Sequence, residues 1–274
     1  MGSAMSHQGT KTGVERIAAA FAGSGKRAAL MPYVMGGFPT LEESVRIGEA
    51  CVQAGADVIE LGVPYSDPLA DGPVIHAAGT RALAAGASIA GILEVARALS
   101  QSVPVVLMCY ANMVMAPGAE AFVERLALTG ACGLIVPDLP LGEAPEVPAA
   151  CQEHDIALVG LVAPTTTPER MAAIGESTQG FLYTVSVVGT TGEREALQDR
   201  FAEVVARARA STRAPVALGF GIGTPAQARQ AADAGADGVI VGTRLVRAAT
   251  ETEDPASAVG AVVGELAAAL AQGR

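Results

Sequence analysis

One pattern recurs eight times along the sequence: a short apolar run rich in Val, Ile and Leu, then a loop, then an Ala-rich helical stretch. The apolar runs are almost continuously hydrophobic, which is typical of parallel strands buried on both faces. Eight such units in about 250 residues predict a (β/α)8 TIM barrel. A doubly wound open sheet is the alternative, but no G-x-G-x-x-G motif opens the first helix. The predicted strands span 30–35, 57–62, 105–109, 133–136, 157–161, 181–185, 216–219 and 238–241.

Capping residues mark the ends of several predicted helices. Threonine before a helix can accept a hydrogen bond from its first turn, and glycine after a helix can adopt the left-handed conformation of a C-cap. The candidate caps are Thr40, Thr167 and Thr224 at N-termini, and Gly55, Gly130 and Gly235 at C-termini. The predicted helices include 41–54, 89–100, 119–128, 168–174, 202–210 and 225–234.

Two further helices are predicted at the ends of the chain. The amphipathic stretch 14–22 precedes the first strand, and we expect it to plug the bottom of the barrel. The stretch 255–272 follows an Asp-Pro start signal and is predicted to be a closing helix. Residues 1–13 are interpreted as a tag and flexible N-terminus, and residues 14–274 as a single (β/α)8 barrel domain.

The composition excludes several classes of protein. Of 274 residues, 50% are apolar and 17% charged, which excludes global disorder. A net charge of −10 disfavours binding to nucleic acid or to an acidic membrane. We find no uninterrupted apolar stretch of about 18 residues, so no transmembrane helix is expected. Four scattered cysteines without a CxxC pair predict buried thiols in a reducing compartment, and no signal peptide is recognisable, so we expect the cytoplasm.

Acidic residues are concentrated at and after the second predicted strand. Glu60 lies within the strand, and Asp67 and Asp71 follow in the loop. An ionisable group in an apolar strand is costly unless it is partnered or used, and barrel chemistry lies at the C-terminal strand ends. Glu60 is therefore the first candidate for acid–base catalysis and Asp71 the second. The alternatives are a buried Glu60 satisfied by backbone donors, and ordinary turn chemistry for the aspartates.

Glycine-rich turns follow the last three predicted strands. The turns at 219–224 and 241–244 each open onto a helix, where backbone amides can bind a phosphate without any Lys or Arg. We expect a phosphate site there, and the alternative is a pair of tight structural turns. The segment 186–193, with two Gly around two Thr, is predicted to be a phosphate cradle, a flexible lid or both.

Scarce residue types exclude two mechanisms. A Schiff-base aldolase needs a lysine on a strand, but Lys11 lies in the N-terminal tail and Lys26 precedes the first strand. A metal-dependent aldolase or epimerase needs clustered histidines and acids, whereas the histidines stand far apart at positions 7, 76 and 154. No metal site is therefore predicted, and carboxylate acid–base chemistry remains.

The segment around Glu60 resembles a family signature. Residues 59–73 read Ile-Glu-Leu-Gly-Val-Pro-Tyr-Ser-Asp-Pro-Leu-Ala-Asp-Gly-Pro, which is similar to the signature of the tryptophan synthase alpha subunit. Supporting motifs follow in the family's order at 108–112, 136–140, 189–192 and 219–222. The resemblance covers nearly the whole chain from about Arg27. It implies a lyase of tryptophan biosynthesis that cleaves indole-3-glycerol phosphate to indole and glyceraldehyde 3-phosphate by a retro-aldol reaction.

The resemblance also implies roles for individual residues. Glu60 would be the proton shuttle, and burial should raise its pKa towards neutrality. Asp71 would accept a hydrogen bond from the ring N–H, and Tyr183 would help to hold Glu60 or the substrate hydroxyl. The implied substrate-binding residues are Tyr33, Met108, Phe220 and the lid residue Thr191. The implied phosphate-binding residues are Gly192, Gly219, Gly242 and Thr243.

The family's alpha subunit docks on a pyridoxal-phosphate beta subunit in an α2β2-type complex, so the resemblance implies that partner and no cofactor in this chain. The implied docking surface consists of Pro64, Asp67, Pro68, Asn112, Asp138 and Pro140. A stand-alone lyase that releases free indole is the alternative. A non-catalytic activator of a beta-type partner is a third possibility, and intact Glu60 and Asp71 argue against it. Outside the family, an epimerase or isomerase remains, disfavoured because metal ligands are absent.

Overall fold

Eight parallel strands close into a barrel in the computed structural model, which describes residues 11–185, 194–219 and 221–271. Each strand pairs with the next, and β8 returns to pair with β1. The strands are β1 (Ala29–Met35), β2 (Ile59–Gly62), β3 (Val105–Met108), β4 (Gly133–Ile135), β5 (Ala157–Val162), β6 (Leu182–Val185), β7 (Val216–Gly219) and β8 (Gly238–Val241). The predicted barrel is confirmed, with every strand boundary within two residues, and the open sheet is excluded.

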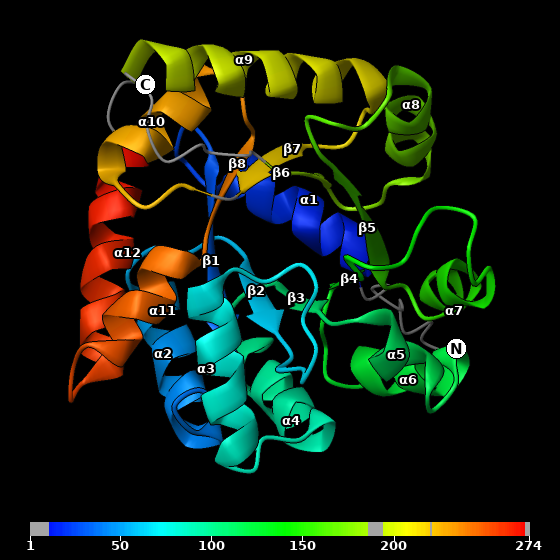
Figure 1. The fold of residues 1–274 in the computed structure, drawn as a ribbon, viewed down its shortest axis with the longest axis vertical. Helices are drawn as coiled ribbons and strands as arrows, with labels where there is room; N and C mark the ends of the chain where they lie inside the picture. Colours follow the sequence, from blue (N-terminus) through cyan, green and yellow to red (C-terminus); the bar gives the residue numbers. More distant parts are fainter. Residues whose placement is uncertain (1–10, 186–193, 220, 272–274) are drawn as a thin grey trace, which may run out of the picture.

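Helices surround the barrel (Figure 1). The helices are α1 (Gly13–Gly23), α2 (Leu41–Gln53), α3 (Pro73–Ala84), α4 (Ile89–Leu99), α5 (Ala111–Met115), α6 (Ala119–Ala127), α7 (Glu146–Glu153), α8 (Pro168–Ser177), α9 (Arg194–Ser211), α10 (Pro225–Asp233), α11 (Thr243–Thr250) and α12 (Pro255–Ala271). No residue range was predicted for α3, α5, α7 or α11, although the turn at 241–244 was expected to open onto a helix, which is α11. Among the described residues no single helix is long and apolar enough to cross a membrane; α3 and α4 pass that test only as a pair bent by 109°.

The predicted caps are present. The Thr40 side chain accepts a hydrogen bond from the Glu43 amide at 3.1 Å, and Thr167 caps α8 in the same way. Thr224 forms a reciprocal capping box with Gln227 at the start of α10. The three glycines predicted as C-caps all have φ between +81° and +103°, a region that side chains with a Cβ rarely adopt. These are Gly55, Gly130 and Gly235.

Helix α1 closes the bottom of the barrel, as predicted for 14–22. Ile17 is fully buried and packs among the side chains of the barrel interior. Phe21 contacts Phe181 of the β6 end, with ring centroids 5.8 Å apart. Gly13 approaches the backbone so closely that a Cβ there would lie 2.1 Å from the Cys132 carbonyl oxygen. The N-terminus of α1 is therefore held against the barrel by a contact that only glycine permits. The predicted tag and flexible N-terminus spans residues 1–13, of which 1–10 lie outside the described residues, whereas Thr12 caps α1 and Gly13 is its first residue.

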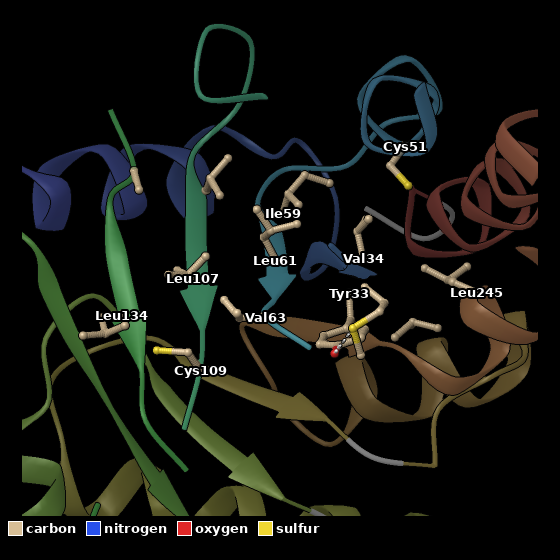
Figure 2. Close-up of a cluster of buried hydrophobic side chains, with 14 of the residues drawn as sticks. Tyr33, Val34, Cys51, Ile59, Leu61, Val63, Leu107, Cys109, Leu134 and Leu245 are labelled. Atoms are coloured by element: carbon tan, nitrogen blue, oxygen red, sulfur yellow. Dashed lines mark hydrogen bonds between the residues drawn. The ribbon is translucent and has the colours of Figure 1, made fainter. Parts of the chain in front are cut away.

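A second apolar layer lies between the strands and the outer helices. Figure 2 shows part of it, with Val34 from β1, Cys51 from α2 and Leu245 from α11. The four cysteines are buried and unpaired, as expected for structural thiols. With apolar residues on both faces, the strands form a rigid support for the groups at their C-terminal ends.

Candidate active site

A cavity of about 340 Å³ opens at the C-terminal end of the barrel. Strand ends and the loops after them contribute its walls, so it lies where barrels of this kind place their chemistry. The predicted residues that line it are Tyr33, Glu60, Asp71, Met108, Tyr183, Gly242 and Thr243. Residues that the sequence reasoning did not single out also line it: Ala70, Gly72, Ile75, Gly221, Ile222, Gly223, Gln227, Ile240, Arg244 and Arg247.

Glu60 lies on β2, opposite Tyr33 of β1 and Val106 of β3, and is 1% exposed. Its Oε2 atom is buried and has no hydrogen-bond partner among the described residues. The alternative of a carboxylate fully satisfied by backbone donors is therefore wrong. Burial, and secondarily the nearby negative charge of Asp71, raises the pKa of Glu60 to about 8. At neutral pH this group is mostly a neutral acid, which is the state that a proton donor needs.

Asp71 reaches the same cavity from the loop between β2 and α3. Burial raises the pKa of Asp71 above its ordinary value, and the Tyr110 hydroxyl and His76 offset part of that rise. Glu60 is thus buried with a bare oxygen, whereas the Asp71 carboxylate has partners that favour its charged form. Two carboxyl groups in different environments can divide the roles of acid and charged acceptor.

Two tyrosines of the cavity rest on glycines of the neighbouring strand. Tyr33 pairs with Glu60, and its hydroxyl lies over Gly62, where a Cβ would be 2.1 Å from that oxygen. Tyr183 pairs with Ala217 in the same way, and a Cβ on Gly219 would be 2.6 Å from the Tyr183 hydroxyl. These contacts fix both rings against the side of the cavity.

The Tyr183 contact changes the interpretation of the turn after β7. Gly219 was assigned to phosphate binding, yet it does not line the cavity and instead gives room to Tyr183. Gly221, two residues later, does line the cavity and has φ of +78°, which favours glycine. Phe220, between them, lies outside the described residues, as do Thr191 and Gly192.

The N-termini of α10 and α11 both face the cavity, but they differ in what their amides contact. The Gly223 and Thr224 amides of α10 already donate to the Gln227 side-chain oxygen, at 2.9 and 3.1 Å. In α11 the first intrahelical bonds begin with the Leu245 amide, so the amides of Thr243 and Arg244 precede them. The α11 end, after Gly242, is therefore the better open anion site of the two.

Two arginines of α11 also border this end of the cavity. Arg244 and Arg247 are exposed and line it, and neither has a salt-bridge partner within the part of the chain that the structure describes. The sequence argument held that a phosphate would need no Lys or Arg. The structure adds two cations at that site, in a chain whose net charge is −10.

The residues of the implied docking surface lie in segments that follow β2, β3 and β4, but they differ in exposure. Asp67, Asn112, Asp138 and Pro140 are exposed and Pro68 is half-buried, whereas Pro64 is buried. Asp138 also has a structural contact, because its Oδ1 accepts a hydrogen bond from the first amide of α5 at 2.8 Å. Pro64 therefore cannot make a direct docking contact without a change in its loop.

Other ionisable residues lie away from the cavity. His154 follows α7 and its Nε2 lies 2.5 Å from Glu120 Oε1, so it has a role in linking two outer helices. No group of three or more His, Cys, Asp or Glu side chains is arranged to hold a metal within the described residues.

Comparisons with known proteins agree with this geometry. The family model described as "Tryptophan synthase alpha chain" matches residues 20–272. The tryptophan synthase alpha chain of Prochlorococcus marinus (strain MIT 9313) is 50% identical over 223 residues, which cover 81% of each chain. That of Methanosarcina barkeri (strain Fusaro) is 45% identical, covering 88% of this chain and 91% of its own.

A solved structure of tryptophan synthase from M. tuberculosis superposes with a TM-score of 0.86 at 41% identity, covering 94% of this chain and 99% of the other. The range matched by the family model, residues 20–272, contains all eight strands and every residue that lines the cavity. A family model over almost the whole chain, two curated relatives and a shared fold lead to one conclusion: the chain belongs to the tryptophan synthase alpha chain family.

Proposed function

We propose that Glu60 and Asp71 are the acid–base pair with which this lyase of tryptophan biosynthesis cleaves indole-3-glycerol phosphate to indole and glyceraldehyde 3-phosphate. The observation that carries the assignment is the pair itself. A buried Glu60 with a bare oxygen and an Asp71 carboxyl both line one cavity at the C-terminal end of the barrel.

The reaction needs one proton delivered and one removed. Glu60, protonated at neutral pH, donates its proton to carbon 3 of the indole ring, and the Asp71 carboxylate accepts a hydrogen bond from the ring N–H as positive charge develops there. Glu60, now charged, takes the proton of the glycerol hydroxyl. The carbon–carbon bond then breaks, its electron pair returns to the ring, and the aldehyde forms. Glu60 ends in its starting state, so no net proton is consumed.

The remaining cavity residues divide between the two ends of the substrate. Tyr33 and Met108 supply apolar walls for the ring, and Tyr183 stands near Glu60, whose charge contributes to raising the Tyr183 pKa. Gly242, Thr243 and the amides at the start of α11 would hold the phosphate, with Gly221 in place of Gly219. The binding roles of Thr191, Gly192 and Phe220 remain proposals that come from the resemblance.

We further propose that the chain acts as the alpha subunit of an α2β2-type complex in the cytoplasm. The implied docking surface supports this assembly, because most of its residues are exposed in segments that follow the C-terminal ends of β2, β3 and β4. Pyridoxal phosphate would belong to the beta partner, and this chain would need no cofactor of its own. The stand-alone lyase is not favoured, since the relatives that match are alpha chains of tryptophan synthase.

Steady-state release of indole from indole-3-glycerol phosphate tests the assignment. Glu60→Gln should lower kcat by at least about a hundredfold, because it removes the transferable proton. Glu265→Gln, an exposed change on α12, is the matched control and should keep wild-type turnover. Near-normal turnover by Glu60→Gln would refute the proton-shuttle role. Slow turnover that rises steeply on addition of a beta subunit would support the complex, and fast turnover alone would favour the stand-alone lyase.

A further inference from the structure

A second groove lies at the N-terminal end of the barrel, opposite the end that carries the catalytic cavity. It has a volume of about 460 Å³ and is bordered by the segment between α1 and β1, the segment between α9 and β7, and the residue before β8. Four cationic side chains and one acidic side chain line it: Lys26, Arg27, Arg209, Arg213 and Asp237. The chain has a net charge of −10, so its composition does not explain this concentration of positive charge. No step of the proposed lyase reaction involves this end of the barrel.

Two of the four cations are neutralised by acids next to the groove. Lys26 Nζ lies 2.9 Å from Asp57 Oδ1, and both side chains are largely buried, with exposed fractions of 12% and 10%. Arg27 forms an ion pair with Asp233. These two pairs stabilise the junction between α1 and β1 and contribute no net charge to the groove.

Arg209 is paired as well, and its guanidinium group is held in one orientation. Its Nη2 atom lies 2.5 Å from Asp237 Oδ1, and its Nε atom donates a hydrogen bond to the Gly235 carbonyl oxygen at 2.8 Å. The other carboxylate oxygen of Asp237 accepts a hydrogen bond from the Val216 amide at 2.9 Å. Arg209 therefore forms a fixed wall of the groove, and its Nη1 atom has no hydrogen-bond partner in the part of the chain that the structure describes.

Arg213 is the cation that remains. It is exposed and lies two residues beyond the end of α9. Its side chain has neither an ion pair nor a hydrogen bond within residues 11–185, 194–219 and 221–271. Glu176 lines an adjacent hollow together with Arg213, but the two side chains form no ion pair there. Four cations set against three paired acids leave the groove with one net positive charge, which is located on Arg213.

Two hydroxyl groups beside these cations also have protons to donate. The Ser24 oxygen accepts a hydrogen bond from the Lys26 amide at 3.2 Å, and the Thr212 oxygen accepts one from the Ala214 amide at 3.1 Å. Each hydroxyl therefore uses an acceptor site and keeps its own proton, for which the described residues offer no acceptor. The groove thus offers several donors, and a ligand that fits it must supply acceptor oxygens and negative charge.

We propose that this groove is a second anion site of the chain, that it binds a small phosphate ester, and that Arg213 is its principal charged ligand. A phosphate group presents several acceptor oxygens, and a guanidinium group can bind two of them at once. The two hydroxyls and Arg209 Nη1 supply further donors. The groove is larger than the catalytic cavity of about 340 Å³, so it has room for the organic part of the ester. This site is independent of the proposed lyase function and of the phosphate site at α11.

An NMR titration of the ¹⁵N-labelled full chain with inorganic phosphate, and then with glycerol 3-phosphate, tests the proposal. The amide signals of residues 24–26 and 212–214 should shift and saturate with either probe, and the ester should bind at least as tightly. The amides of residues 243 and 244 report the catalytic end separately. Arg213→Ala should weaken binding at residues 212–214 at least about tenfold and leave the response at 243 and 244 unchanged.

Two variants serve as comparisons. Arg125→Ala removes an exposed arginine from α6 and should keep the wild-type affinity at both ends of the barrel. Arg213→Lys keeps the positive charge but loses the two-pronged contact, so its affinity should lie between those of wild type and Arg213→Ala.

Several results would overturn the proposal. Shifts at 212–214 that do not saturate, or that sodium chloride of equal ionic strength reproduces, would show general attraction of anions instead of a site. Equal affinity for acetate, or weaker binding of the ester than of inorganic phosphate, would contradict the ligand class. Wild-type affinity in Arg213→Ala would contradict the role of Arg213. Because the amide signals report binding and not turnover, each result holds whether or not the chain releases indole.

Discussion

Replacing Glu60 by Gln should make the protein more stable at alkaline pH. The side chain is 1% exposed, and burial with the nearby Asp71 charge raises its pKa from 4.5 to about 8. Between these two values the folded chain keeps a proton on Glu60 that the unfolded chain has lost. Linkage then requires the free energy of unfolding to fall as the pH rises from about 4.5 to 8. Gln carries no charge at any pH and does not incur this loss.

The size of the effect follows from the two pKa values. The interval from 4.5 to about 8, at about 1.4 kcal/mol per pKa unit, corresponds to about 5 kcal/mol. In a chain of this length a change of 1 kcal/mol moves the thermal midpoint by about 2 °C. The stability difference between Glu60→Gln and wild type should therefore grow by about 10 °C between acid and alkaline pH, and it should level off above pH 8.

Urea unfolding of both proteins at a series of pH values from 5 to 9 measures the difference directly. Every other titrating group is common to the two chains, and Tyr33 and Tyr183, whose pKa the Glu60 charge helps to raise, titrate above this pH range, so those contributions cancel. Glu265→Gln, which removes an exposed carboxylate from α12, should follow the wild-type curve. A difference between Glu60→Gln and wild type that stays constant from pH 5 to pH 9 would show that the fold does not hold Glu60 protonated, and the proton-donor argument would lose its basis.

Three other changes test separate parts of the molecule. Arg244→Ala should raise KM about tenfold and leave kcat nearly unchanged, because one charge-assisted contact to the phosphate is lost. Saturation kinetics measure this, with the distant exposed variant Arg125→Ala as the control, and an unchanged KM in Arg244→Ala would contradict the prediction. Gly219→Ala places a Cβ 2.6 Å from the Tyr183 hydroxyl and should lower the free energy of unfolding by about 1–3 kcal/mol. Adding Tyr183→Phe to the same chain should relieve part of this loss, and if the effects of the two substitutions on stability were simply additive, the contact would be contradicted. Ile17→Ala should lower the free energy of unfolding by about 2–5 kcal/mol and leave KM unchanged. If urea unfolding gave this variant the stability of wild type, α1 would not close the barrel as described.

The strands and the buried acid Glu60 were predictable because their signals are local. Continuous apolar runs identify buried parallel strands, and every predicted strand was confirmed within two residues. Glu60 stood out for a similar reason, since a charge inside such a run has few structural explanations. Its burial and bare oxygen in the structure agree with that inference.

Other features depend on contacts between distant segments and leave little trace in the sequence. Helices α5 and α11 have five and eight residues, so their stability comes from packing rather than from a periodic pattern. The expectation that backbone amides alone would bind the phosphate also left Arg244 and Arg247 without a predicted role, although both line the cavity. Likewise, the choice between Gly219 and Gly221 for the phosphate could not be made without knowing that Tyr183, on the neighbouring strand, occupies the space above Gly219.

The close contact between the Tyr33 ring and Gly62 has a consequence for how this family can evolve. A Cβ at Gly62 would meet the hydroxyl, Cζ and a ring carbon of Tyr33 within 2.7 Å, so neither position can change freely while the other stays. A substitution of the glycine becomes acceptable only after the tyrosine has been replaced by a smaller side chain. Among descendants of a common ancestor, the two positions should therefore vary together, and a glycine in such a pair would look invariant for steric reasons rather than because it touches the ligand.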